Sequence, residues 1–331
     1  MELLNASTQQ AMRTQLQHRR DRLAHTIAET RDTTRLVALL KEVEAALKYV
    51  DSGSYGVCEV CHESIDEEHL KWDSLVRVCL SHLSEEQQHA IERDLDLASK
   101  IQTTLLPARH IQLNGWDVSY LYAPAGFVGG DYCDIVKSEL DHASLYFFLG
   151  DVSGKGVAAS LLMSHLHAIV RSLVTSNSSV SQMTEQANRL FHESTMSTHY
   201  ATLVSGRAMS GGEVQICNAG HCPPLVLHNG SITAVESTGL PIGLFSGGGY
   251  AIRTLRLSPG DSLIVYTDGL TESRNPSDVE YGTERVKAVA ARHRAHAPQS
   301  LVDALVTDVD AFRSGAQRAD DLTVMVLART T

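Results

Sequence analysis

Seven short β-rich runs follow Pro107, and turn-forming Gly, Pro, Asn and Asp residues separate them. Such runs are typical of strands, because aromatic and β-branched side chains pack well on a pleated sheet. Three longer helical stretches, 156–174, 180–195 and 298–313, interrupt them. Hairpin-like strands grouped with helices predict an α+β fold, a sandwich of sheets flanked by helices. The seven runs are WDVSYLYAP, SLYFFLGDV, ATLVSGRAM, EVQICNAG, PLVLHNG, DSLIVYTDG and LTVMVLA.

The chain before Pro107 has a helical pattern instead. Apolar residues recur at alternating spacings of four and three between 36 and 50, which predicts a helix packed in a short hairpin. The turn residues of 51–56, DSGSYG, end that helix. A further helix is expected from Ser84, a suitable N-terminal cap, to Leu106, where Pro107 stops it. The apolar positions are Leu36, Leu40, Val43, Leu47 and Val50, with Leu23 and Ile27 weaker, and then Ile91, Leu95, Ala98 and Leu105.

These patterns predict a helical module at 1–83, a linker helix at 84–107 and a third region at 108–331. The apolar stripe of the linker helix must be buried against another surface. That surface is either the third region or a second copy of the chain, so a homodimer through this helix is one expectation.

The overall charge limits the partners of the chain. Its 331 residues carry a formal net charge of −11, which argues against broad nucleic-acid binding. No stretch approaches 18 uninterrupted apolar residues, and the N-terminus lacks the basic-then-apolar pattern of a signal peptide. We therefore expect a soluble, cytoplasmic protein without a membrane segment.

Three of the six cysteines lie close together and predict a metal site. Cys58 and Cys61 form C-x2-C, and after the spacer 62–78 Cys79 and His82 form C-x2-H. Two such i, i+3 pairs supply the four tetrahedral ligands that zinc favours. Because protein fills all four positions, we expect the zinc to be structural. His62 and His69 are alternative ligands. We disfavour them because neither occupies a position in the second i, i+3 pair of ligands, which we call the second knuckle.

The segment at roughly 35–83 resembles the DksA/TraR family of zinc-finger proteins. The matching stretches are VEAALKYVDSGSYGVCEVCHESI, HLKWDSLVRVC and the second knuckle. The usual fourth ligand of that family is cysteine, and His82 stands in its place here. The resemblance implies a zinc-binding fold. It also suggests an alternative function. The chain would then be a regulator that binds RNA polymerase or another protein, and the third region would not contribute to that activity.

The turn after SLYFFLGDV contains Gly154 and Lys155, which suggests a nucleotide-binding loop. A P-loop also needs a glycine at the position of Leu149 and a Ser or Thr at the position of Gly156. Two of its four defining positions therefore fail, and the nucleotide reading is rejected. The remaining feature of this turn is Asp151.

Aspartates stand at the ends of several apolar runs. A lone acid beside a turn is usually a turn residue, but four such acids favour a shared site. Hard oxygen ligands select Mg²⁺ or Mn²⁺, and paired ions can activate a water and clamp a phosphoryl group. The sequence therefore predicts metal-assisted hydrolysis, with Asp151 bridging two ions and Val152 contributing its carbonyl. The acids are Asp131, Asp151, Asp268, and either Asp320 or Asp321.

A rival chemistry is that of a cysteine phosphatase. The stretch GHCPPLVLH begins like an H-C-x5-R loop, with His221 and Cys222. However, His228 occupies the arginine position, and Pro223 and Pro224 remove backbone N–H donors that a phosphate would need. We therefore expect His221 to pack in a loop beside the site.

Residues from about 92 to 329 resemble the metal-dependent (PPM) protein phosphatases of the SpoIIE/RsbU type. The resemblance implies a PPM-type β-sandwich between helical layers, two manganese or magnesium ions, and phosphoserine or phosphothreonine protein substrates. Such enzymes commonly act on STAS-domain anti-sigma antagonists in the partner-switching pathways of sigma-factor regulation. The stretches that carry it are ASKIQTTLLP, PAGFVGGDYCDIV, LGDVSGKGVAASLLM, ICNAGHCPPLVL, TGLPIGLF, LSPGDSLIVYTDGLTESRN, EYGTERV and ADDLTVMVLA.

The same resemblance implies roles for single residues. Asp151 bridges the ions, the carbonyl of Val152 contributes, and Asp320 rather than Asp321 is the C-terminal ligand. Lys155 either attracts the substrate phosphate or is a solvated turn lysine. The expected function is a serine/threonine protein phosphatase whose N-terminal zinc module acts through the linker helix. The acids that match the family's metal ligands are Asp131, Asp151, Asp268 and Asp320.

Overall fold

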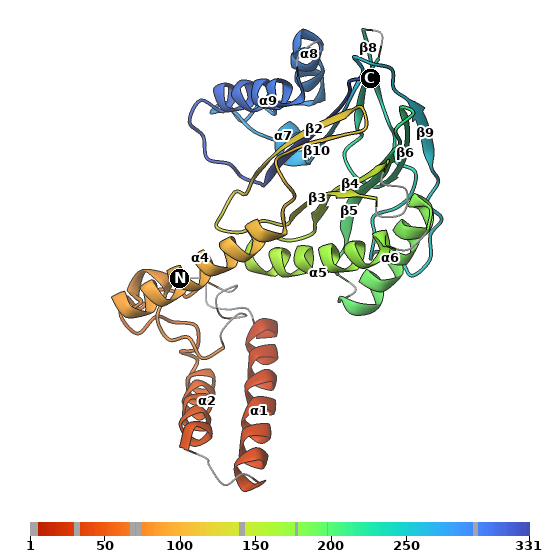
Figure 1. Cartoon of the computed structure of the whole chain (residues 1–331). Coiled ribbons are helices and arrows are strands. Elements are labelled where there is room, and N and C mark those ends of the chain that lie inside the picture. Colours follow the sequence, from red (N-terminus) through yellow and green to blue (C-terminus); the bar gives the residue numbers. More distant parts are fainter. Residues whose placement is uncertain are drawn as a thin grey trace. The chain divides into compact units, whose positions relative to one another are not determined.

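The computed structural model describes residues 6–29, 34–66, 70, 74–138, 143–175, 178–196, 198–228, 230–293 and 297–331 (Figure 1). The chain divides into two compact units, Met1–Arg93 and Asp94–Thr331. The division falls inside helix α4 (Glu85–Leu105), so this helix contributes residues to both units. Each unit is described by itself.

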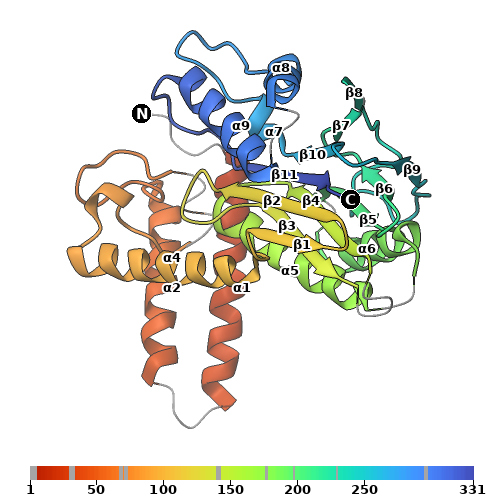
Figure 2. The same cartoon turned by 45° about the horizontal axis from the view of Figure 1, so that its top comes forward.

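The N-terminal unit is built on the predicted helical hairpin. Helices α1 (Ala6–Glu29) and α2 (Thr34–Ser52) pack side by side (Figures 1 and 2). Helix α2 ends as expected, because Gly53 takes a φ of +74°, a conformation that glycine adopts without steric cost. The short 3₁₀ helix η1 (Leu80–His82) carries the second metal knuckle. The core of this unit consists of Met12, Leu16, Val43, Ala46, Leu47, Tyr55, Cys58, Ile65 and Leu70.

Helix α4 begins with the predicted cap. The backbone N–H of Gln87 donates to Ser84 Oγ at 3.2 Å, and the N–H of Ser84 donates to Gln87 Oε1 at 3.0 Å. This reciprocal pair is a capping box, which satisfies N–H groups that the first turn leaves free. The helix ends at Leu105, two residues before Pro107.

Two antiparallel sheets form the centre of the C-terminal unit (Figure 2). One sheet has the order β1-β2-β11-β10-β7-β8, and the other has the order β3-β4-β5-β6-β9. All seven predicted runs form strands, which confirms the expected α+β architecture. The strands are β1 (His110–Leu113), β2 (Trp116–Ala123), β3 (Asp131–Lys137), β4 (Leu145–Val152), β5 (Ala201–Ala208), β6 (Glu213–Ala219), β7 (Leu225–His228), β8 (Ser231–Ala234), β9 (Arg253–Arg256), β10 (Ser262–Tyr266) and β11 (Leu322–Arg329).

Helices cover the outer face of each sheet. The predicted helices α5 (Gly156–Val174) and α6 (Val180–Ser194) pack on the five-stranded sheet (Figure 1). On the other sheet lie the predicted α9 (Pro298–Arg313) and the unpredicted α8 (Thr283–His293). A single turn, α7 (Asp268–Thr271), contacts β11. The layers are therefore helix, sheet, sheet and helix.

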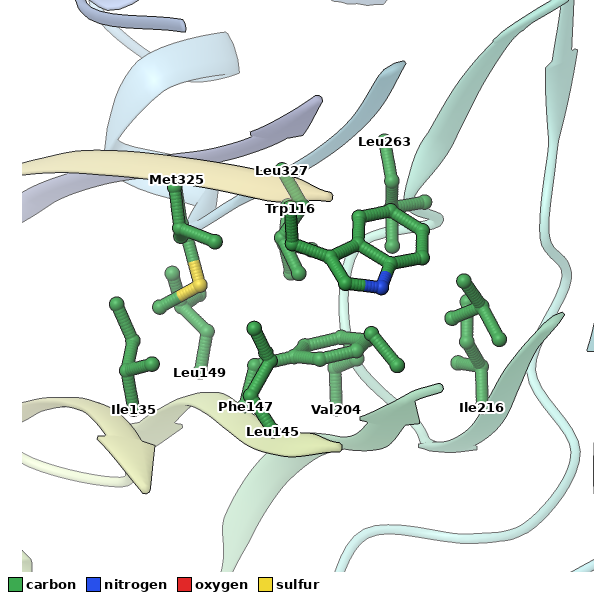
Figure 3. Close-up of a cluster of buried hydrophobic side chains, with 14 of the residues drawn as sticks. Trp116, Ile135, Leu145, Phe147, Leu149, Val204, Ile216, Leu263, Met325 and Leu327 are labelled. Atoms are coloured by element: carbon green, nitrogen blue, oxygen red, sulfur yellow. The ribbon is translucent and has the colours of Figure 1, made fainter. Parts of the chain in front are cut away.

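The space between the sheets is filled with large apolar side chains (Figure 3). Trp116, Met325 and Leu327 project from the six-stranded sheet toward Phe147 and Leu149 of the other sheet. Their burial stabilises the sandwich, at about 25 cal/mol for each Å² of apolar surface removed from water. The polar residues at the strand ends are thereby held on a rigid frame.

Among the described residues, helix α5 is long and apolar enough to cross a membrane by length and composition alone. In this fold it is a core helix. Its buried residues Met163, Leu166 and Val170 pack in the same cluster as Tyr132 of β3 and Phe148 of β4.

Candidate metal centres and active site

Cys58, Cys61, Cys79 and His82 come together in the N-terminal unit, as the sequence predicts. Their ligand atoms all lie within 4.8 Å of one another. Cys79 Sγ is 3.1 Å from His82 Nδ1, and Cys61 Sγ is 3.9 Å from Cys79 Sγ. Three sulfurs and one imidazole are a donor set that zinc accepts, so this cluster could hold a metal ion.

The backbone around Cys58 favours its thiolate form. The N–H of Cys79 donates to Cys58 Sγ at 3.3 Å. Burial raises the pKa of Cys58, but the backbone N–H groups of Cys61, Cys79 and Val60 together lower it to about 6. The thiolate is the form that binds a metal. His62 is not one of the four clustered ligands, and His69 lies outside the described residues.

The first pair of predicted acids lies on neighbouring strands of the C-terminal unit. Asp131 of β3 and Asp151 of β4 are register partners. Asp131 is 1% exposed, and its Oδ2 accepts hydrogen bonds from Thr267 Oγ1 at 2.9 Å and Thr323 Oγ1 at 2.5 Å. Thr267 follows β10 and Thr323 belongs to β11, so hydroxyls from the opposite sheet orient Asp131.

Asp131, Asp151, Asp268 and Asp320, which we call the acid cluster, affect one another electrostatically. Burial, followed by the charge of Asp151, raises the pKa of Asp131 well above its ordinary value. Burial, followed by the charges of Asp268 and Asp320, raises the pKa of Asp151 to about 7. Burial and then Asp320 raise the pKa of Asp268. Crowded, partly buried carboxylates are unfavourable without a cation, and their oxygens suit Mg²⁺ or Mn²⁺.

The adjacent Asp320 and Asp321 have different environments. Asp321 is 9% exposed, and its two oxygens accept from the backbone N–H groups of Ala125 at 2.7 Å and Gly130 at 2.6 Å. Asp320 is more open, with 45% of its side chain exposed and Oδ2 at 2.9 Å from Lys155 Nζ. Asp321 thus holds a loop, whereas the carboxylate of Asp320 remains accessible.

Lys155 lies beside the acid cluster and not in a phosphate-binding loop. Its Nζ donates to the carbonyl of Ala319 at 2.8 Å as well as pairing with Asp320. The hydrogen bond with Asp320 raises the pKa of the ammonium. Gly154 and Gly156 take φ values of +107° and +66°, which lets the chain turn sharply around it. The lysine therefore stays charged next to the candidate active site.

A cavity of about 340 Å³ opens next to Asp320 and Lys155. Phe127 and Val157 give it an apolar wall, and Leu95 of α4 also lines it. It is large enough to admit part of a peptide substrate beside the acids.

The cysteine alternative is not supported by the environment of Cys222. Burial and then the charge of Asp268 raise the pKa of its thiol to about 12. Burial lowers the pKa of His221 to about 4, so the imidazole is neutral. A protonated thiol beside a neutral histidine is a poor nucleophile. His221 packs in a loop as expected, where its Nδ1 lies 2.8 Å from Thr202 Oγ1 and its backbone N–H donates to Asn218 Oδ1 at 2.8 Å.

Three further residues hold the site together, and they were not predicted from the sequence. Thr267 and Thr323 each stand next to a predicted ligand motif, in YTDGL and DDLTV, which was their only signal. Gln102 of α4 lies in ASKIQTTLLP and bonds to the loop before Asp131. All three support the site and are not predicted ligands themselves.

Comparison with known proteins places most of the C-terminal unit in one family. The family model of Stage II sporulation protein E (SpoIIE) matches residues 141–330, more than half of the chain. Protein IcfG of Synechocystis sp. is 25% identical over 277 residues, which are 75% of this chain and 43% of IcfG. The phosphoserine phosphatase RsbU of Bacillus subtilis is 26% identical over 245 residues, 73% of this chain and 72% of RsbU.

A solved structure shows the same likeness. The RsbU and RsbW domains of Rv1364c from Mycobacterium tuberculosis are 29% identical to the chain, with a TM-score of 0.56. The match covers 68% of this chain and 62% of that one. The two antiparallel sheets and their helices thus agree with those of a protein of related sequence.

Proposed function

The chain belongs to the SpoIIE family, and we propose that it is a protein serine/threonine phosphatase whose acid cluster binds two Mn²⁺ or Mg²⁺ ions for the reaction. The observation that carries the proposal is the crowding of the acid cluster. Three of its four pKa values are raised by burial and by neighbouring carboxylates, which is the situation that bound cations relieve. We call residues 94–331 the catalytic unit from here on.

We assign the metal ligands by their environments. Asp151 would bridge the two ions, with the carbonyl of Val152 beside it. Asp320, rather than Asp321, is the C-terminal ligand in this proposal, because both oxygens of Asp321 are already bonded to backbone N–H groups. The assigned carboxylate ligands are Asp131, Asp151, Asp268 and Asp320.

The chain's own residues then prepare the site for a phosphoprotein. When bound, the ions would supply a water of lowered pKa and neutralise the charge of the phosphoryl group. Thr267 and Thr323 fix the orientation of Asp131. The ammonium of Lys155, which lies at the edge of the cluster, would attract the substrate phosphate.

The substrate that we propose is a phosphoserine or phosphothreonine regulatory protein, specifically a STAS-domain anti-sigma antagonist in a partner-switching pathway. The similarity to RsbU, a phosphoserine phosphatase by name, supports this class of substrate. Because the chain spans 43% of IcfG and 72% of RsbU, the partners of those proteins are carried over only as a proposal. A cytoplasmic location is part of the same proposal.

For the N-terminal unit, we propose a DksA/TraR-like module with one structural Zn²⁺. The support is the Cys3His cluster, in which protein supplies all four donors. The module would regulate the phosphatase. The alternative, a regulator of RNA polymerase with a passenger phosphatase, is disfavoured by the hydroxyls and backbone bonds that organise the acid cluster.

We also propose that α4 mediates a homodimer. Leu97 and Ile101, one turn apart on α4, are 57% and 54% exposed, which is unusual for large apolar side chains. Leu95 and Leu105 of the predicted stripe are partly buried instead.

Release of phosphate from a phosphoserine STAS-domain protein tests the proposed function. The full chain should release phosphate with Mn²⁺ and lose this activity when EDTA removes the metal. Polymerase binding without any metal-dependent phosphate release would favour the alternative.

A further inference from the structure

Five large apolar residues of the catalytic unit are exposed on two loops, one before strand β5 and one between β8 and β9. Between 36% and 69% of each residue is accessible to water. Scattered apolar residues are normal on a surface, but these come from two segments that pair with each other. Ala201 and Ile242 join the segments by exchanging both backbone hydrogen bonds, at 2.9 and 2.8 Å. The five residues, which we call the apolar rim, are Met196, Tyr200, Leu240, Leu244 and Phe245.

Polar side chains of α6 hold the loop that carries Leu244 and Phe245. The backbone N–H of Gly243 donates to Asn188 Oδ1 at 2.8 Å, and Asn188 Nδ2 donates to the carbonyl of Phe245 at 3.1 Å. Asn188 is only 3% exposed. Nδ1 of His192 lies 2.7 Å from the carbonyl oxygen of Gly243. The backbone of this loop is therefore fixed, although its two largest side chains remain in water.

Gly243 lets the loop turn close to α6. Its φ is +83°, a left-handed conformation that glycine adopts without steric cost. A Cβ at this position would lie 2.6 Å from a ring carbon of Phe191. The preceding Ile242 is fully buried, so the chain is anchored there and then presents Leu244 and Phe245 to solvent. A loop that is fixed with large apolar side chains in water is typical of a contact surface for another molecule.

The apolar rim begins beside the metal-binding turn. Thr202 is the register partner of Asp151. The ladder continues to Tyr200, whose carbonyl accepts from the N–H of Ser153 at 2.9 Å. Residues of a strand alternate between its faces, so Tyr200 shares one face with Asp151, whereas Ala201 lies in the apolar cluster under α5 and α6. From strand spacings, the Cα atoms of Tyr200 and Asp151 are roughly 8 Å apart.

The rim is uncharged, which suits a phosphoprotein as the partner. The segments 195–203 and 237–252 contain no Asp, Glu, Lys or Arg, in a chain with a net charge of −11. A phosphorylated protein can therefore approach from this side without repulsion by acidic side chains of these segments. An interface of standard size covers about 800 Å² on each partner, or roughly 30 Å across. A protein whose phosphoserine reaches Asp151 would thus also cover Tyr200.

We propose that the apolar rim is the docking surface for the phosphoprotein substrate of the catalytic unit. The inference rests on the proposed phosphatase function and deepens it. The partner that fits is a folded protein that carries its phosphoserine or phosphothreonine next to an exposed apolar patch. Leu240 and Phe245 would bury their side chains against that patch while the phosphate reaches the acid cluster. The rim contributes to binding of the whole protein and not to the reaction at the phosphate.

Steady-state kinetics with two substrates tests the proposal on the full chain at saturating Mn²⁺. One substrate is a phosphoserine STAS-domain protein, and the other is p-nitrophenyl phosphate, which is too small to contact the rim from the acid cluster. Phe245→Ser and Leu240→Ser each remove an exposed apolar side chain from the rim, so both variants should fold. Val279→Ser is the matched control, because Val279 is 54% exposed and lies outside the rim.

Phe245→Ser is expected to raise KM for the phosphoprotein about tenfold, and Leu240→Ser about threefold, because each removes apolar contact with the bound protein. The kcat should stay near the wild-type value, since these contacts are equally strong before and during the reaction. Hydrolysis of p-nitrophenyl phosphate should be unchanged in both variants. Val279→Ser should match the wild type with both substrates.

Wild-type KM for the phosphoprotein in both rim variants would overturn the inference. An equal loss of activity on p-nitrophenyl phosphate would also overturn it, because the rim would then act on the metal centre. If Phe245→Ser separates a dimer in sedimentation while KM stays unchanged, the rim binds a second copy of the chain and the inference is wrong. A wild-type chain that releases no phosphate from the phosphoprotein would instead overturn the proposed function on which the inference depends.

Discussion

Asp131 and Asp151 are direct partners in the register of strands β3 and β4. Directly opposed residues of an antiparallel pair have their Cβ atoms about 4.5–5.5 Å apart, which is unfavourable for like charges. The side chain of Asp131 is also fully buried. Two opposed carboxylates without a cation would therefore destabilise the fold. A bound cation would relieve their repulsion, so the arrangement suits a metal site.

The first prediction concerns the acid cluster. Asp151→Asn and Asp268→Asn should each lower turnover by about a thousandfold or more at saturating Mn²⁺, because each removes charge from a metal shell. The metal-free variants should melt no lower than the wild type, since repulsion among the carboxylates is relieved. Phosphate release and thermal unfolding measure the two effects.

Asp303→Asn changes an exposed aspartate of α9 and is the matched control for this experiment. It should leave both turnover and the melting temperature unchanged. Wild-type turnover in both active-site variants would eliminate the two-metal proposal.

The second prediction concerns zinc. Cys58→Ser should release the metal and unfold the N-terminal unit locally, because structural zinc contributes roughly 10–16 kcal/mol of apparent binding energy in small modules. His62→Gln, next to the first knuckle but outside the ligand cluster, should keep it. Zinc content by mass spectrometry and limited proteolysis provide the readouts. Wild-type protein without stoichiometric zinc would refute the assignment, as would equal zinc loss from His62→Gln.

The third prediction concerns acid stability. Burial lowers the pKa of His221 to about 4 in the folded chain, whereas an unfolded histidine has a pKa of about 6.5. The unfolded chain therefore binds more protons between these values, and folding stability should fall as the pH decreases from 6.5 to 4. The difference of about 2.5 pKa units corresponds to roughly 3 kcal/mol.

Urea unfolding at pH 7.5, 5.5 and 4.5 measures this effect. His221→Gln should lose that part of the pH dependence, and the exposed-residue control His110→Gln should retain it. Parallel pH profiles for wild type and His221→Gln would show that His221 is not the group responsible.

The fourth prediction concerns an ion pair between a buried carboxylate and a partly exposed arginine. The side chain of Asp134 is completely buried, and it accepts from Arg171 Nε at 2.6 Å and Nη2 at 2.8 Å. Arg171→Met removes the cationic partner of that carboxylate. His167 lies 3.8 Å away, but burial lowers the pKa of its imidazole and favours the neutral form, so the change should cost about 3 kcal/mol of unfolding free energy.

Adding Asp134→Asn to Arg171→Met should recover most of this loss, because the buried charge is then gone. Denaturant unfolding of the single and double variants tests both statements. A double variant as unstable as the single one would mean that packing of the arginine stem, and not charge pairing, matters at this position.

The fifth prediction separates two faces of α4. Ile101→Asp should disrupt self-association, because it places a charge on the exposed apolar pair with Leu97. Leu95→Asp should change turnover, because Leu95 lines the cavity beside Lys155 and Asp320. Sedimentation and turnover are measured on the same preparations. If both variants match the wild type in both measurements, α4 is only a tether.

Elements with strong local signals were predictable from the sequence. Helices α5, α6 and α9 match the expected stretches 156–174, 180–195 and 298–313 to within one residue. Each has an apolar face, and α6 also begins with a capping box at Ser179. The seven strands that were found have dense apolar or β-branched runs.

The missed elements depend on distant partners. Strand β3 reads DYCDIVK, and its two acids are tolerated only because Arg171 and the hydroxyls of Thr267 and Thr323 reach them. Strands β1, β8 and β9 have four residues each with a largely exposed or half-buried pattern, and pairing to a neighbour defines them. The strand propensity of a short segment does not show which distant residues it pairs with.

The acids of the site were predictable from the sequence, but the hydrogen bonds that hold them and their loop in place were not. No local pattern could tell that Asp321 bonds to Gly130, because 191 positions separate the two residues in the chain. The same holds for Gln102 and Gly129, which meet only once the last turns of α4 pack on the rest of the catalytic unit.

The central position of β11 has a consequence for synthesis of the protein on the ribosome. This strand pairs with β2 on one side and β10 on the other, and it begins two residues after Asp320. Asp131, Asp151 and Asp268 are all translated earlier, yet Thr323 of β11 is needed to orient the first of them. A nascent chain that has not yet released β11 from the exit tunnel therefore has an open gap between β2 and β10 and no assembled catalytic centre. Completion of this sheet and the onset of hydrolysis are expected to be a single event, so an interrupted translation product would be catalytically silent.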